Sequence, residues 1–109
     1  MAAGGIVYMA TSAKTAVFLM ESYMADAARG NANALYELGV AYSTGINGVD
    51  VDLIEAHKWF NLAALNGSER AQESRAEIAD EMSAREIAEA QRQARAWLVQ
   101  TGQGMRRAA

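Results

Sequence analysis

The sequence predicts an all-α protein, a short α-solenoid of antiparallel helix-turn-helix hairpins with about five helices and a C-terminal capping helix. Three observations support this fold class. The chain contains no proline, so no helix is interrupted by a residue that lacks the backbone N–H. Apolar residues recur at steps of three and four along most of the chain, which is the spacing of one helix face. Small residues also recur 37 positions apart, as in Gly30 and Gly67 or Ala34 and Ala71, and such a period is typical of stacked helical hairpins.

The first three helices are predicted from their apolar spacing and their ends. Residues 1–14 are expected to form a flexible or lightly docked N-terminus, and a helix is expected over 15–29, ending at a glycine cap. A second helix is predicted over 32–44, and the loop after it contains Gly45 and Gly48. Asp52 and Glu55 have the spacing of a capping box, which predicts a third helix from 53 to about 66.

The last two helices are predicted from their N-caps. Ser68 precedes a polar helix expected over 69–82, and Ser83 and Glu86 form a second capping box before a helix over 84–100. Residues 101–109 are expected to be a frayed tail. The chain is therefore predicted to be one repeat domain over 15–100 between two short ends.

Composition and charge exclude several classes of protein. The 109 residues include 10 Lys and Arg against 13 Asp and Glu, and a net charge of −3 argues against a nucleic-acid-binding protein. The absence of cysteine excludes a disulfide scaffold, a thiolate nucleophile and a cysteine-ligated zinc site. No uncharged run is long enough to span a membrane, and no basic residue precedes Lys14, as a secretory signal requires. A cytoplasmic protein is the default expectation.

An ordered set of short motifs covers residues 30–67. In order, these motifs are G-x-x-x-A-x-x-x-L-G-x-x-Y, G-V-x-x-D, A-x-x-W and A-A-x-x-G. In this combination the segment resembles the Sel1-like repeats, which are relatives of the tetratricopeptide repeats, and the resemblance covers one full repeat. It implies structural roles for the residues at the motif positions, which are Ala34, Leu38, Gly39, Tyr42, Gly45, Gly48, Asp52, Ala56, Trp59, Ala63, Ala64 and Gly67.

The segments on both sides are similar to degenerate repeats. The helix over 15–29 resembles the second helix of a preceding repeat, with Ala27 and Gly30 retained. Residues 68–100 resemble a following repeat that has lost its Leu-Gly and Tyr positions and ends in a cap. Apart from the resemblance, Gly39 predicts a close approach of two helices, and Trp59 and Phe60 are expected to fill the space between helices.

No pattern indicates a catalytic, cofactor-binding or metal-binding site. His57 is the only histidine, and we interpret it as a surface or half-buried structural residue rather than as a lone general base. The carboxylates of the fourth helix are interleaved with Arg70, which is typical of a solvated helix face; they belong to Glu73, Glu77, Asp80 and Glu81. We therefore expect neither enzyme activity nor a cofactor.

The resemblance implies a non-catalytic protein–protein interaction module, an adaptor that binds a protein or peptide segment. It places the binding surface on the outward residues of the second and fourth helices, which are Asn33, Tyr36, Glu37, Val40, Arg70, Glu73 and Glu77. This surface is acidic with one arginine, so the expected partner segment is basic or amphipathic.

The alternative function is a self-associating structural or accessory subunit of a larger assembly. One full repeat is short for a free-standing solenoid, which usually needs about three. Phe18, Met20 and Met24 are interpreted first as core residues and, in this alternative, as an adaptable docking surface together with the apolar N-terminus. Deletion of residues 1–13 distinguishes the two functions, because it is expected to abolish a dimer and to leave a monomeric adaptor folded.

Overall fold

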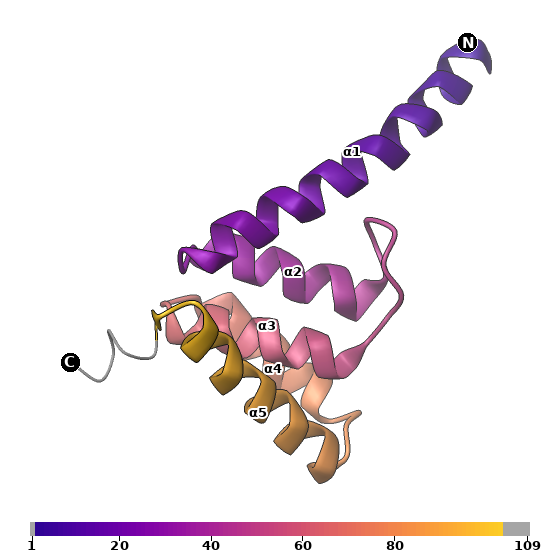
Figure 1. Ribbon diagram of the computed structural model, residues 1–109. Coiled ribbons are helices and arrows are strands. Elements are labelled where there is room, and N and C mark those ends of the chain that lie inside the picture. The colour runs from indigo at the N-terminus through magenta and orange to yellow at the C-terminus, as the bar shows by residue number, and fades with distance from the viewer. Residues whose placement is uncertain (1, 104–109) are drawn as a thin grey trace.

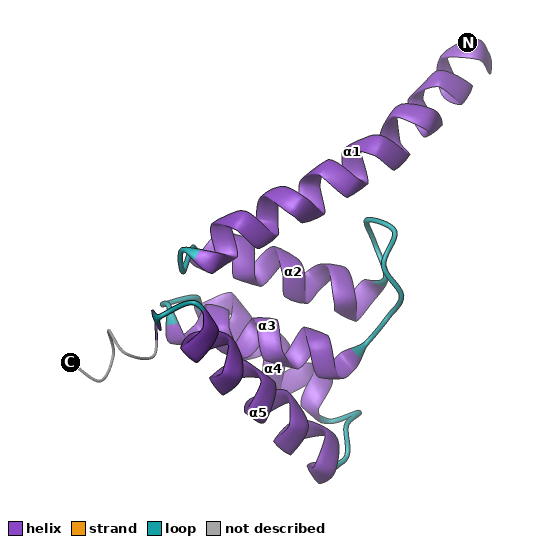
Figure 2. Cartoon of the chain, viewed as in Figure 1, coloured by secondary structure: helices purple, strands orange, loops and turns teal. Residues whose placement is uncertain are grey.

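Five helices follow one another in the computed structural model, which describes the backbone of residues 2–103 and the burial of residues 13–103 (Figure 1). They are α1 (Ala2–Ala28), α2 (Ala32–Thr44), α3 (Leu53–Leu65), α4 (Glu69–Ala79) and α5 (Ala84–Gln100). Residues 2–103 contain no strand (Figure 2). The predicted all-α fold of short helical hairpins is confirmed.

The helices pack as a stack centred on α3. Helix α3 contacts α2, α4 and α5, and α2 also contacts α1 and α4. Helix α1 lies against α2, and its N-terminal end extends past the other helices, which gives the molecule dimensions of 55 × 30 × 21 Å (Figure 1). None of the helices searched within the described residues is both long and apolar enough to span a membrane.

The core combines a few large side chains with many alanines. The largest fully buried side chains are those of Trp59, Phe60, Leu35, Leu38 and Leu62. Alanines from all five helices are buried around them: Ala27, Ala34, Ala41, Ala56, Ala63, Ala71, Ala90 and Ala94. Because alanine projects only one methyl group, the helix axes approach closely, and the large side chains of α2 and α3 fill the remaining volume.

Four helices begin at a side-chain N-cap, as the sequence predicts for α3, α4 and α5. Asn31, Asp52, Ser68 and Ser83 each accept a hydrogen bond from the backbone N–H three residues later. The capping box of Ser83 and Glu86 is complete. The predicted box of Asp52 and Glu55 is only half formed, since the backbone N–H of Asp52 instead donates to the carbonyl of Tyr42, at 2.8 Å.

The ends of three predicted helices differ from expectation. Helix α1 begins at Ala2 rather than near residue 15, because residues 2–14 contain no proline and several alanines, which favour helix. Helix α4 ends at Ala79 rather than near 82, where Glu81 and Met82 donate hydrogen bonds to carbonyls only three residues back and tighten the chain into a turn. Helix α3 ends at Leu65, one residue earlier than predicted.

The beginning of the C-terminal tail is docked rather than frayed. Gln103 is 7% exposed, and its side-chain amide donates to the carbonyl of Ala28 at 3.0 Å. The last carbonyls of α1 have no partner within the helix, so this amide satisfies one of them. The remaining residues of the predicted tail, 104–109, lie outside the described part of the chain.

Two of the three residues first interpreted as core on α1 face solvent. Phe18 is 69% exposed and Met24 is 38% exposed, whereas Met20 is partly buried and packs against the core. The physical reason is that α1 has a single large neighbour, α2, which covers only one side of it. The spacing of apolar residues does not show how many neighbours a helix has.

Candidate protein-binding surface

The predicted binding residues lie on two helices that contact each other directly. Helix α2 carries Asn33, Tyr36, Glu37 and Val40, and helix α4 carries Arg70, Glu73 and Glu77. Spacings of three and four place the members of each group on one face of their helix. Since α2 and α4 are in contact, the two groups are neighbours, and we call them together the α2–α4 face.

The contact between Tyr36 and Arg70 joins the two halves of this face. The guanidinium carbon of Arg70 lies 4.3 Å from the centre of the Tyr36 ring, in the position of a cation–π contact. The same ring lies 5.6 Å from the ring of Phe60, at an angle of 47°. Tyr36 thus connects the exposed Arg70 to the buried core of α3, and its position is held by both neighbours.

Acidic side chains surround this contact. Glu73 and Glu77 are exposed on α4, and Glu37 is half-buried on α2. The ion pairs of the described residues involve other carboxylates, those of Asp26, Glu55 and Glu89. Three carboxylates against the single guanidinium of Arg70 give the face a surplus of negative charge.

The two remaining residues of the face differ in exposure. Asn33 is exposed in the first turn of α2. Val40 is half-buried and packs against the core, and its carbonyl accepts hydrogen bonds from the hydroxyls of Ser43 and Thr44. Val40 therefore contributes mainly to the edge of the hydrophobic core.

The residues with implied structural roles occupy three kinds of position. Ala34, Leu38, Gly39, Ala56, Trp59 and Ala63 are buried where helices cross, and Tyr42 and Ala64 are half-buried. Gly45, Gly48 and Gly67 have positive φ angles of 77°, 81° and 98°. Asp52 caps α3. These placements pack α2 against α3 and thereby position the exposed residues of α2.

Glu55 has a role that its sequence position does not reveal. Its carboxylate accepts hydrogen bonds from Lys58 and from the indole N–H of Trp59, each at 3.0 Å. The Lys58 ammonium also lies 4.5 Å from the Trp59 ring centre. The Trp59 ring in turn meets Trp97 of α5 edge-on, with centroids 4.8 Å apart. These contacts of Glu55, Lys58, Trp59 and Trp97 join α5 to α3. The only sign of them in the sequence is an acidic residue four positions before a tryptophan.

His57 is more deeply buried than predicted, with 4% of its surface exposed. Burial lowers the pKa of His57, and the positive charge of Arg75 on α4 lowers it further. Its Nδ1 atom has no hydrogen-bond partner in the described structure. The His57 side chain is thus enclosed where α3 packs against its neighbouring helices.

The acidic residues of α4 do not converge on a metal ion. Within the described residues, no group of three or more His, Cys, Asp or Glu side chains has the arrangement of a metal site. Two open pockets on the described surface are lined by none of the residues of the α2–α4 face. One is lined by Lys58, Arg92, Gln93, Ala96, Trp97 and Gln100, and the other by Ala64, Gly67, Ser68, Glu69 and Gln72.

Comparison with known proteins identifies one repeat in the chain. The family model described as Sel1 repeat matches residues 32–68, which correspond to α2, the loop after it, α3 and the N-cap of α4. The matched segment agrees with the one that carries the ordered motifs. Neither the curated proteins nor the solved structures compared with the chain give a significant match.

Proposed function

The chain contains a Sel1 repeat at residues 32–68, and from this premise we propose that it is a non-catalytic adaptor whose α2–α4 face binds a segment of another protein. Sel1 repeats generally mediate protein–protein interaction. The observation that supports this face is the stacked pair of Tyr36 and Arg70, which combines an aromatic ring and a guanidinium at the junction of two helices. Tyrosine and arginine are among the residues that contribute most energy to protein interfaces.

The charge of the face defines the proposed partner. A segment with lysine or arginine side chains pairs with Glu37, Glu73 and Glu77, while an apolar side chain of the same segment packs beside the Tyr36 ring. An amphipathic helix or an extended basic segment supplies both features. Because exposed charges supply much of this attraction, binding is expected to weaken as the salt concentration rises.

The proposal is tested by affinity capture with matched variants. The tagged full chain captures proteins from a lysate of its source organism, alongside the double variant Glu73→Lys and Glu77→Lys and the single variant Arg70→Ala. The matched control is Glu81→Lys with Arg95→Ala, since both residues are exposed and lie outside the face. A partner retained by the wild type and the control but lost by the face variants supports the proposal. Equal retention by all variants overturns it.

Tyr36 is tested separately because its ring also packs on Phe60. Tyr36→Phe keeps that contact and the stacked guanidinium and is expected to retain binding, whereas Tyr36→Ala is expected to lose it. Circular dichroism of each variant shows whether the helices remain folded. If Tyr36→Ala stays folded and binds the captured partner as tightly as the wild type, the ring has no part in binding.

A further inference from the structure

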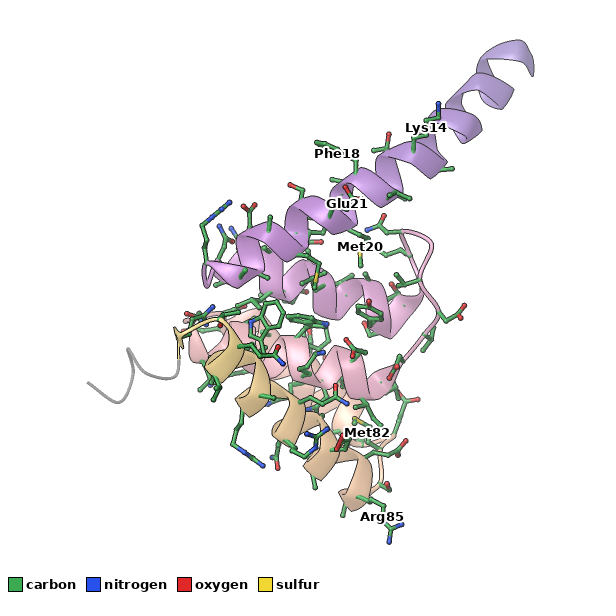
Figure 3. All side chains as sticks on the ribbon, in the orientation of Figure 1. Lys14, Phe18, Met20, Glu21, Met82 and Arg85 are labelled. Atoms are coloured by element: carbon green, nitrogen blue, oxygen red, sulfur yellow. The ribbon has the colours of Figure 1, made fainter. Side chains whose placement is uncertain are left out.

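The outward face of α1 carries an unusual combination of residues. Phe18 is 69% exposed and Val17 is 59% exposed, although both are large apolar residues within a regular helix. Both Lys14 and Phe18 project from the side of α1 that faces away from the other helices (Figure 3). Helix α2 covers the opposite side of α1, where Ala27 is fully buried and Met20 and Tyr23 are partly buried.

Two opposite charges flank this apolar pair. Lys14 lies four residues before Phe18, and Glu21 lies four residues after Val17, so the four side chains share one stripe of the helix. Lys14 is exposed, and so is Glu21. The ion pairs of the described residues include neither of them. The stripe therefore carries a positive charge at one end, an apolar centre and a negative charge at the other end.

We propose that this stripe binds the same stripe of a second copy of the chain, with the two α1 helices antiparallel. A two-fold interface brings identical surfaces together, so the surface must be complementary to itself. The midpoint between Lys14 and Glu21 falls between Val17 and Phe18. A two-fold axis at that point places Phe18 and Val17 of both copies at the centre and pairs Lys14 of each copy with Glu21 of the other.

The charges select the antiparallel arrangement. A parallel pair in register brings Lys14 next to Lys14 and Glu21 next to Glu21, and such like-charge pairs oppose association. In the antiparallel pair both contacts are between opposite charges. Since α2 packs on the far side of α1, the rest of each copy lies away from the helix–helix contact. The dimer leaves both α2–α4 faces accessible, so this inference stands independently of the proposed function.

Charge reversal tests the pairing directly. The mass of the full chain in solution is measured by sedimentation over a range of concentrations for the wild type, Lys14→Glu, Glu21→Lys and the double swap. The wild type is expected to dimerise, and each single swap is expected to raise the dimer dissociation constant about tenfold or more, because two attractive contacts become repulsive. The double swap restores both attractions and is expected to dimerise like the wild type.

Mixing the two single variants provides a second test, of whether opposite charges on the two stripes drive association. Lys14→Glu has two acids on its stripe and Glu21→Lys has two bases, so the two variants are expected to form a mixed dimer more stable than either alone. Phe18→Asp is expected to abolish dimers, while the control Val99→Asp, at a 74% exposed position on α5, leaves them intact. Circular dichroism verifies that every variant keeps its helices.

Three results overturn the proposal. The first is a wild-type chain that remains monomeric at the highest concentration measured. This result overturns the proposal even if the α1 face binds a different molecule. The second is a dimer that neither Phe18→Asp nor the charge swaps weaken. The third is a dimer that both single swaps weaken and the double swap fails to restore, because antiparallel pairing of Lys14 with Glu21 requires that restoration.

Discussion

At the scale of single residues, the contact between Gly39 and Phe60 determines how closely α2 and α3 pack. A Cβ atom built on Gly39 would lie 2.4 Å from the Phe60 Cδ1 atom, well inside van der Waals contact. Gly39 has an ordinary helical conformation, so its φ angle does not require glycine. Glycine is required at this position because the Phe60 ring lies against its backbone. The phenyl ring occupies the space that a side chain at position 39 would fill.

Gly39→Ala is therefore expected to lower the free energy of unfolding. Alanine gains about 1 kcal/mol in helix propensity, but forcing a methyl group into the Phe60 ring costs about 1 to 3 kcal/mol, so the clash outweighs the gain. Urea unfolding measures the difference. The double variant with Phe60→Leu serves as the control, because the smaller side chain makes room for the methyl group. Strictly additive losses in the double variant would show that the two residues do not compete for space.

His57 is expected to make stability depend on pH. Its pKa is lowered in the folded state from the ordinary value of 6.5, so the unfolded chain binds the proton more readily. Stability is then fully present above pH 6.5 and is lost as the pH falls from there through the folded-state pKa, by up to about 1.4 kcal/mol per pH unit. Urea unfolding across this range measures the slope. Since His57 is the only histidine, His57→Gln is expected to flatten it, and an unchanged slope would refute this assignment.

At the scale of elements, the starts of the four capped helices, α2 to α5, were the most predictable feature, whereas the start of α1 and the long-range partners were not predictable. Ser68 and Ser83 mark helix starts because their hydroxyls accept hydrogen bonds from amides three residues away, and such local contacts are visible in the sequence. Glu55 was placed in a capping box by the same reasoning, yet it binds Lys58 and Trp59. The backbone N–H of Asp52, which Glu55 would bind in a complete capping box, donates instead to the carbonyl of Tyr42. That contact depends on the shape of the loop between Tyr42 and Asp52.

The α2–α4 face was predictable in part, because only features that are local in the sequence can be read from it. Helical spacing groups Asn33, Tyr36 and Glu37 on one face of α2, because that spacing is local. The stacking of Arg70 on Tyr36 joins residues on different helices, and it depends on the angle at which α4 crosses α2. The exposure of Phe18 was missed because it depends on the number of helices that pack on α1.

The end of α1 is held by a residue that follows α5. The Gln103 side-chain amide donates to the Ala28 carbonyl at 3.0 Å and lies 3.5 Å from the Ala27 carbonyl. Gln103→Ala is expected to cost about 1 kcal/mol of stability and to speed hydrogen exchange in the last turn of α1. The control Gln100→Ala changes an exposed glutamine on the same segment. Equal exchange in both variants would show that the Gln103 contact does not hold α1.

At the scale of the whole molecule, one Sel1 repeat positions two separate surfaces. The repeat at residues 32–68 supplies α2 and α3, and the flanking helices pack on either side of it. Helix α4 adds Arg70 to the α2–α4 face. Helix α1 lies against α2 at one end of the stack (Figure 1) and carries the self-complementary stripe. In the dimer proposed above, two copies present two α2–α4 faces, which raises the effective affinity for a partner with two basic segments.

The most direct test of the proposed adaptor function is photo-cross-linking to the captured partner from single positions. A photoreactive side chain at position 73 lies on the α2–α4 face, and one at position 95 lies on α5 and serves as the control, since Glu73 and Arg95 are both exposed in the structure. A covalent adduct from position 73 and none from position 95 is the predicted result. An adduct from position 95 with none from position 73 would contradict the assignment of the binding surface to α2 and α4.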